Sequence, residues 1–273
     1  MPTQAEKALA FRALHQRKSA FIIPNPWDTG TARLLARVGF EALATTSAGY
    51  AFSAGRPDNS TTREDMMAHV RIIAAATDLP VSGDLENGFC DSPQTVAETI
   101  RLAAAAGLVG GSIEDSTGRR DEPIYEFKHS VARVQAAAEA AHALPFPFIF
   151  TARSENYLVG RADLKDTIHR LQAYQEAGAD VLYSPGLLRR EDIAEVVRSV
   201  DRPVNVLAGL QGFGLTLDDL SAIGVRRVSV GSALSRAALG EFLRAAQEMR
   251  EHGTFDFVDR AVSFREINGS FED

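Results

Sequence analysis

The chain has 273 residues, of which 45% are hydrophobic and 24% are charged, the composition of an ordinary globular protein. Its net charge of −7, with the basic residues scattered among acidic ones, argues against a nucleic-acid partner. No apolar run is long enough to span a membrane, the N-terminal segment lacks a signal-peptide core, and the single cysteine, Cys90, excludes an intrachain disulfide, so we expect a cytoplasmic protein without a membrane partner.

Short apolar runs alternate with longer amphipathic runs along the chain. The apolar runs, each typical of a buried strand, are 19–27, 42–48, 80–86, 109–115, 147–155, 180–186, 203–209 and 226–234. The runs between them have helical spacing and helix-terminal residues: the run at 92–107, for example, starts with Ser-Pro and ends with Gly. Strands that alternate with helices indicate a parallel sheet.

Eight strand-then-helix units in a chain of this length predict one α/β domain over 1–273, a TIM (β/α)8 barrel. An open doubly wound sheet is the alternative, but no G-x-G-x-x-G motif follows the first strand, which argues against its dinucleotide-binding version. The segment 235–273, a helix at 235–252 followed by a tail, is too short for a second domain. We expect the apolar residues of this tail to pack on the barrel or on a neighbouring subunit; they are Phe255, Phe257, Val258, Val262 and Phe264.

Charged side chains stand at the ends of neighbouring strands, where a TIM barrel places its active site. The third strand run ends with Asp84 and Glu86, and the fourth with Glu114 and Asp115. Residues two apart in a strand point to the same face, so Asp84 and Glu86 would lie side by side and repel unless a cation or a shared proton compensates them. Oxygen donors of this kind suit Mg²⁺, whereas the plainer alternative is helix capping or an ordinary salt bridge, for example from Asp115 to a nearby arginine.

Arg153 lies within the apolar run of the fifth strand. A buried arginine normally has an anionic partner. That partner is either Glu114 or Glu155, or it is a substrate carboxylate held by two hydrogen bonds, which is the interpretation we favour. Cys90 has no basic neighbour in the sequence and is expected to be structural, and none of the six histidines falls at a strand end, so no catalytic histidine is expected.

Six segments, taken in order and at their spacing, resemble the isocitrate lyase/phosphoenolpyruvate mutase superfamily over nearly the whole chain. They are "TTSAGYA" (45–51), "GRPD" (55–58), "SGDLENGF" (82–89), "GGSIED" (110–115), "TARSENY" (151–157) and "AYQEAGAD" (173–180). The resemblance implies a TIM barrel with Mg²⁺, or Mn²⁺ in its place, at the carboxyl ends of the strands. It also implies a homotetramer, or a dimer, in which the helix at 235–252 and the tail are exchanged between subunits.

The resemblance implies a role for each acidic residue of the site. Asp84 looks like the direct metal ligand, and Glu86 and Glu114 look like ligands that act mainly through metal-bound water. Asp58 looks like an acid in the same outer shell. Asp58 and Glu114 are therefore, with Arg153, the candidate catalytic residues.

For the substrate, the resemblance points to one short segment and one arginine. Ser47, Ala48 and Gly49 look like the segment that holds a 2-oxo acid through its backbone and hydroxyl groups. Arg153 looks like the positive group on the substrate carboxylate. The implied partner is thus a small 2-oxo acid, such as pyruvate, or a dicarboxylate.

The loop after the fourth strand departs from the family pattern. Lyases of this superfamily carry a Lys-Arg-Cys-Gly-His motif there, whereas this chain reads "EDSTGRRDEPIYEF" (114–127), without Cys or His. The mutase and hydrolase branches use a Lys and an Asn or Thr, which this loop does not match cleanly. The loop at 116–130 is expected to act as a mobile gate.

Together these features predict a Mg²⁺-dependent lyase in carboxylic acid metabolism. It would act through an enolate on a small 2-oxo acid, or on a precursor that releases one, with C–C cleavage or decarboxylation, because metal and water can do much of this chemistry without the missing thiol. The alternatives are a P–C bond mutase or hydrolase of the phosphonopyruvate type and a non-catalytic binder of 2-oxo acids.

Overall fold

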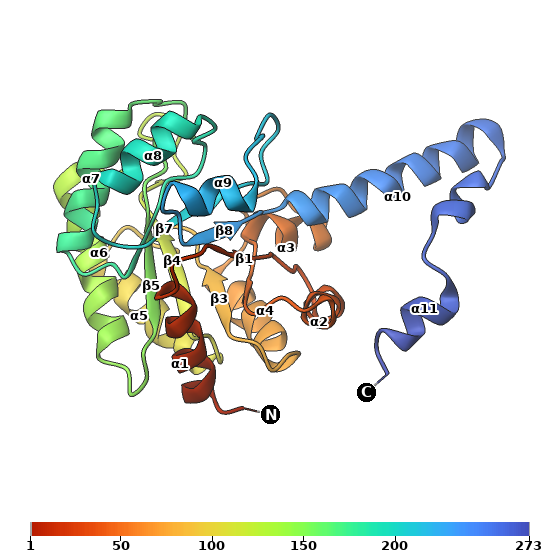
Figure 1. The fold of residues 1–273 in the computed structure, drawn as a ribbon, viewed down its shortest axis with the longest axis horizontal. Helices are drawn as coiled ribbons and strands as arrows, with labels where there is room; N and C mark the ends of the chain where they lie inside the picture. The colour runs from red at the N-terminus through yellow and green to blue at the C-terminus, as the bar shows by residue number, and fades with distance from the viewer. Residues whose placement is uncertain (1, 273) are drawn as a thin grey trace.

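The computed structural model describes residues 2–272 (Figure 1). Its described strands form one parallel sheet in the order β1-β8-β7-β6-β5-β4-β3-β2. They are β1 (Phe21–Ile23), β2 (Leu43–Ala44), β3 (Val81–Asp84), β4 (Gly110–Glu114), β5 (Ile149–Arg153), β6 (Val181–Tyr183), β7 (Val204–Leu207) and β8 (Arg227–Ser229).

The two ends of this order, β1 and β2, meet. The Ala44 N–H donates to the Pro24 carbonyl at 3.0 Å, so the sheet is a nearly closed barrel. The predicted TIM barrel is therefore confirmed, and the open-sheet alternative is wrong. Each strand is shorter than its apolar run: the run at 226–234, for example, leaves β8 after Ser229, and Ala233 already begins the next helix.

Helices surround the sheet as the amphipathic runs predicted. They are α1 (Gln4–His15), α2 (Thr29–Val38), α3 (Ser47–Ser53), α4 (Arg63–Ala75), α5 (Pro93–Ala105), α6 (Phe127–His142), α7 (Leu164–Glu176), α8 (Arg190–Arg198), α9 (Leu217–Ala222), α10 (Ala233–His252), the 3₁₀ helix η1 (Asp256–Arg260) and α11 (Phe264–Gly269). No helix in the described part of the chain is both long and apolar enough to cross a membrane.

Helix α1, which the alternation of runs did not predict, closes the amino-terminal end of the barrel. Thr3 and Glu6 form a capping box that starts it. Phe11 and Leu14 of α1 then pack in one apolar cluster with residues at the strand starts, among them Phe21 and Ile149. The barrel interior is thereby sealed at this end, and the carboxyl ends of the strands form its mouth.

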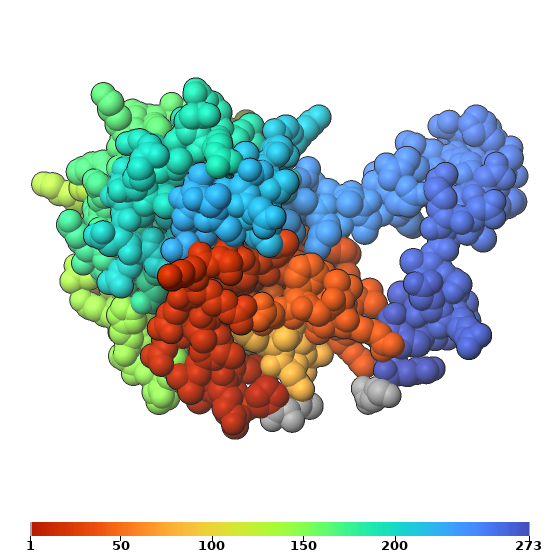
Figure 2. Space-filling view, in the orientation of Figure 1, coloured from red at the N-terminus to blue at the C-terminus, as the bar shows by residue number. Residues whose placement is uncertain are grey.

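Helix α10 projects away from the barrel, and the chain after it turns back towards α2 (Figure 1 and Figure 2). Of its residues only Ser235 is buried. Phe255 and Phe264 of the tail are 64% and 80% exposed, so these two residues do not pack on their own barrel, and the other half of the expectation, packing on a neighbouring subunit, stays a prediction. The last residues do reach α2, where Arg33 donates to the Phe271 carbonyl at 2.9 Å. Contact of α10 with a neighbouring subunit stays a prediction.

Candidate active site

Asp84 is the last residue of β3 and is held from two sides. One carboxylate oxygen accepts hydrogen bonds from the Ser47 N–H at 3.1 Å and the Ser47 hydroxyl at 2.9 Å. The other accepts from Nη1 of Arg153 at 2.9 Å. The Asp84 N–H in turn donates to the Thr45 hydroxyl at 2.9 Å. The strand end, the start of α3 and the fifth strand therefore fix this carboxylate at the mouth of the barrel.

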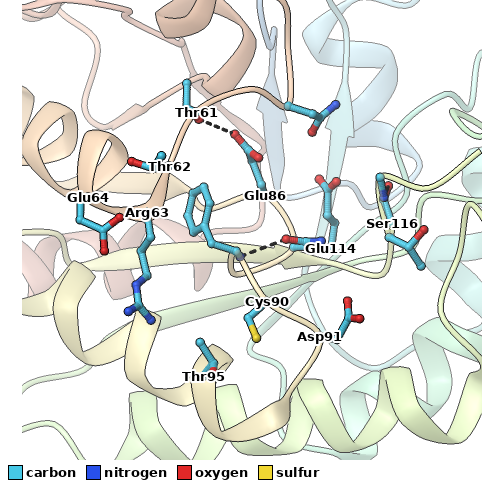
Figure 3. Close-up of a pocket in the computed structure, with 15 residues that line it drawn as sticks. Thr61, Thr62, Arg63, Glu64, Glu86, Cys90, Asp91, Thr95, Glu114 and Ser116 are labelled. Carbon is cyan, nitrogen blue, oxygen red and sulfur yellow. Dashed lines mark hydrogen bonds between the residues drawn. The ribbon is translucent and has the colours of Figure 1, made fainter.

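Glu86 does not continue the strand, which corrects the expected arrangement of the two acids. β3 stops at Asp84, and Glu86 has φ of 49°, in the left-handed region that non-glycine residues rarely adopt. Its carboxylate accepts from the Thr61 hydroxyl at 3.0 Å (Figure 3). Its carbonyl accepts from the Glu114 N–H at 3.0 Å, which secures the turn to the neighbouring strand.

Arg153 binds three carboxylates at once. Its Nη1 donates to Asp84 and its Nε donates to Glu155, both at 2.9 Å, and its Nη2 forms an ion pair with Glu114 at 3.1 Å. Its guanidinium carbon also lies 5.1 Å from the ring centroid of Tyr183, a favourable cation–π distance. Both protein partners that the sequence suggested are thus present together with a third, Asp84, while binding of a substrate carboxylate stays a prediction.

Asp115 supports the cluster around Arg153 indirectly, through Glu155. One of its oxygens accepts from the Glu155 N–H at 2.8 Å, and the other accepts from the Tyr174 hydroxyl at 2.6 Å and from Nη1 of Arg170 at 3.2 Å. The predicted ordinary salt bridge of Asp115 is therefore confirmed. Because it fixes the backbone of Glu155, it also fixes the partner of Arg153.

The acidic groups outnumber the positive charge available to them. Burial and the charge of Asp84 raise the pKa of Glu86 to about 7. Burial, followed by the charge of Asp84, raises the pKa of Asp58. Burial also raises the pKa of Glu114 well above its usual range, although Arg153 opposes this. One guanidinium thus faces a surplus of carboxylates, an arrangement that a further cation would stabilise.

Most of the predicted site residues line two cavities. A cavity of about 170 Å³ is lined by Ser47, Ala48, Asp58, Asp84 and Arg153, among others. A more open one of about 620 Å³ is lined by residues that include Glu86, Glu114, Cys90 and Ser116 (Figure 3).

Gly49 lines neither cavity. Its N–H is bound to the Thr46 hydroxyl at 3.2 Å. A Cβ atom at this position would lie 2.6 Å from the Thr46 methyl group, too close for any side chain. The requirement for glycine here is thus explained by packing.

The acidic side chains of the site supply oxygen donors for a metal ion. Among residues 2–272, no three His, Cys, Asp or Glu side chains are placed to hold one ion together. The donors are nevertheless all carboxylate oxygens with surplus negative charge, which suits a hard cation. Mg²⁺ commonly binds one or two carboxylates and keeps several waters, so this donor set suits Mg²⁺, while the roles of Asp84, Glu86 and Glu114 as its ligands stay a prediction.

Cys90 lies in the larger cavity. Hydrogen bonds from the Ser92 N–H and the Thr95 hydroxyl lower the pKa of its thiol. A search of the sequence for basic neighbours of Cys90 could not reveal this effect, because both donors are neutral. In the loop between β4 and α6, Ser116 and Ile124 form a single antiparallel bridge, and neither Cys nor His occurs between them.

Sequence reasoning missed the neutral groups that position the site. Thr45 and Thr61 hold Asp84 and Glu86, and their hydroxyls carry no charge pattern that would mark them. It also missed Arg227, which lines the smaller cavity, although an arginine inside an apolar strand run was the same signal that marked Arg153.

Comparison with known proteins matches the chain to one family. A family model described as phosphoenolpyruvate phosphomutase matches residues 11–250. A solved structure of a Burkholderia cenocepacia J2315 protein with an unconfirmed lyase/mutase assignment is 66% identical, with a TM-score of 0.97 and coverage of 99% of this chain and 97% of that one.

Two further proteins show similarity over nearly the full length. The 2-methylisocitrate lyase of Escherichia coli (strain K12) is 29% identical, over 95% of this chain and 91% of the relative. The structure of a phosphonopyruvate hydrolase in complex with oxalate and Mg²⁺ is 25% identical, with a TM-score of 0.83 over 97% of this chain and 94% of that one.

Proposed function

This chain is an enzyme of the phosphoenolpyruvate mutase/isocitrate lyase superfamily, and on that premise we propose that it is a Mg²⁺-dependent lyase acting on a small 2-oxo acid or a dicarboxylate that releases one. The reaction we propose is C–C bond cleavage or decarboxylation. The relatives that match it include an enzyme that acts on 2-methylisocitrate and one crystallised with oxalate and Mg²⁺.

One observation carries this proposal. At the mouth of the barrel a single guanidinium, Arg153, bridges carboxylates from three positions, Asp84, Glu114 and Glu155, and Glu86 and Asp58 add further negative charge. A buried cluster of this kind is costly unless a cation compensates it. A divalent cation bound to these carboxylates would lie at the mouth of the barrel, where we also place the 2-oxo acid.

The residues of the proposed site have separate roles in the reaction. Asp84, Glu86 and Glu114 would hold Mg²⁺, which when bound would supply a Lewis acid for the negative charge that develops on a 2-oxo acid as a bond to its methylene carbon breaks. Arg153 adds fixed positive charge at the same cavity and costs no reorganisation, because its carboxylate partners already orient it. Ser47 holds Asp84 through its N–H and hydroxyl. The buried ring of Tyr183 lines the same cavity.

The loop after β4 argues against one kind of C–C cleavage. Without a Cys or His between Ser116 and Ile124, the chain lacks the acid–base group of the superfamily's isocitrate-type lyases. Cleavage in which this loop must donate a proton to the leaving group is therefore disfavoured. Similarity to a phosphonopyruvate hydrolase supports P–C bond cleavage as the second candidate.

We also propose that α10 is exchanged between subunits of a tetramer or dimer. Phe242 and Leu243 on this helix are 68% and 57% exposed, and the helix projects from the barrel (Figure 1). An apolar helix face of this extent is typical of a subunit interface. A second subunit would cover it.

The test is Mg²⁺-dependent release of pyruvate, glyoxylate or phosphate from a panel of 2-oxo acids, dicarboxylates and phosphonopyruvate, with the wild type beside Asp84→Asn. We expect turnover, and a rise in melting temperature with Mg²⁺ and a 2-oxo acid, in the wild type and neither in Asp84→Asn. Asp218→Asn, the same change at an exposed aspartate of α9, should behave like the wild type. Equal activity in Asp84→Asn would refute the proposal. Release of pyruvate and phosphate together from phosphonopyruvate, with no product from the other substrates, would replace it with the second candidate.

A further inference from the structure

A second arginine lies inside the barrel below the acidic cluster. Arg227 is the first residue of β8 and pairs in register with Asn205 of β7 and Phe21 of β1. It is only 5% exposed. The interior of a TIM barrel is usually filled by branched apolar side chains, so a charged group here needs a partner.

All the hydrogen-bond partners of this guanidinium are neutral. Nε donates to Oδ1 of Asn205 at 2.9 Å, Nη2 donates to the Thr151 hydroxyl at 3.0 Å, and Nη1 lies 3.5 Å from Nε2 of His15. His15 is the neutral tautomer that accepts at Nε2, since its Nδ1 donates to the Phe11 carbonyl at 2.9 Å. Burial, followed by the charge of Arg227, lowers the pKa of His15 to about 3.

No carboxylate in the described chain forms a salt bridge with Arg227, in contrast to the three around Arg153. Burial lowers the pKa of Arg227 to about 10, so the group is still charged at neutral pH. An isolated buried charge is among the most costly features a protein core can contain. An aspartate in place of Asn205, whose Oδ1 lies 2.9 Å from Nε of Arg227, would neutralise the guanidinium, but this chain has an uncharged amide at that position.

The same guanidinium faces a cavity. Arg227, Asn205 and Ser229 line the 170 Å³ cavity together with Ser82 and Ser112, so three hydroxyl groups add hydrogen-bond donors to the positive charge. Asp84 and Arg153 at the mouth line this cavity as well, and α1 seals the opposite end of the barrel. A ligand would therefore enter from the active-site side. The volume is enough for several waters or one small organic anion.

We propose that Arg227 is the anion-binding group of an interior subsite that takes a carboxylate. The carboxylate is either one end of the dicarboxylate substrate, in which case the inference rests on the proposed function, or a separate small anion such as formate. In both cases the anion supplies the negative charge that Asn205, Thr151 and His15 do not. The serine hydroxyls complete its hydrogen bonds.

The test is a thermal-shift titration of the full chain with formate and with malonate, in EDTA and in a buffer whose own anion is too large for the cavity. We expect a saturable rise in melting temperature in the wild type. Arg227→Met should raise the dissociation constant roughly thirtyfold or more. Asn205→Asp should do the same while retaining the arginine, because it supplies the missing carboxylate, and it serves if Arg227→Met does not fold. Asp218→Asn should bind as the wild type does.

A crystal of the wild type soaked in bromide gives a readout that needs no variant, and we expect anomalous density beside the Arg227 guanidinium. No saturable shift in the wild type, unchanged binding in Asn205→Asp, or no density at Arg227 would overturn the inference. Repeating the titrations with Mg²⁺ in place of EDTA identifies the source of the carboxylate. A lower dissociation constant for malonate with an unchanged one for formate indicates a substrate carboxylate, and unchanged constants for both indicate a separate anion. Because binding is measured in EDTA, failure of the proposed Mg²⁺-dependent reaction would leave this result standing.

Discussion

His15 should make the protein less stable as the pH falls below neutrality. In the folded chain its ring lies 7% exposed between the Phe11 carbonyl and the Arg227 guanidinium, and these surroundings lower its pKa from 6.5 to about 3. Below the ordinary pKa the unfolded chain takes up a proton that the folded chain cannot accept. The free energy of unfolding contributed by neutral His15 is therefore complete above pH 6.5 and is lost as the pH falls towards 3.

The size of this effect follows from the shift. Each pH unit between the two pKa values is worth about 1.4 kcal/mol, so lowering the pH from above 6.5 to about 5 should cost about 2 kcal/mol through His15 alone. His15→Gln removes the titrating group and keeps a side chain that can donate and accept. The variant should be less stable than the wild type near neutral pH by about 1 kcal/mol, for an imperfectly replaced hydrogen bond, but its stability should fall less on acidification.

The measurement is urea unfolding of both proteins at about pH 7.5 and about pH 5, followed by circular dichroism. The quantity of interest is the difference between the two pH values, because it cancels the cost of the substitution itself. His252→Gln, the same change at an exposed histidine, is the matched control and should keep the acid sensitivity of the wild type. If His15→Gln loses as much stability on acidification as the wild type does, His15 is not held neutral and the description of its contacts is wrong.

Two further predictions concern the support of the site and the assembly. Asp115→Asn leaves Arg170 with only one full carboxylate partner, Asp166, so it should lower the free energy of unfolding by about 3 kcal/mol in a urea titration; an unchanged midpoint would contradict the role of Asp115 as an anchor. Light scattering should give the mass of a tetramer or dimer for the wild type and a smaller mass for Phe242→Glu, since a charge on the exposed face of α10 cannot be buried at an interface. The same mass for both proteins would exclude α10 from the subunit contact.

The barrel itself could be predicted because its signals are local. Each strand run is apolar, and several helix runs begin with a capping residue that the structure uses, for example Thr62 before α4 and Ser92 before α5. The position of α1 and the course of the tail could not, because both depend on which surfaces meet after folding. Nothing in residues 4–15 marks them as the closure of a barrel.

The acidic cluster was predicted for a partly wrong reason. Alternation in a strand placed Asp84 and Glu86 on one face, whereas β3 ends at Asp84 and Glu86 sits in a left-handed turn. Their charges still interact, since Asp84 contributes to the raised pKa of Glu86. The sequence contained a warning of the turn in Asn87 and Gly88, residues that favour such turns. The proximity of the two acids therefore comes from the turn after the strand and not from the pleat.

The two buried arginines show what local sequence leaves undecided. Arg153 and Arg227 both interrupt apolar strands, yet one meets three carboxylates and the other meets an amide, a hydroxyl and an imidazole. The difference is made by neighbouring strands and by α1, which lie far away in the chain. With Mg²⁺ held by the acidic cluster at the mouth, as proposed above, and the uncompensated Arg227 below it, the cavity would have a cation at each end along the barrel axis. A ligand with two negative ends matches two such cations better than a ligand with one, and for this reason dicarboxylates belong first in the substrate panel.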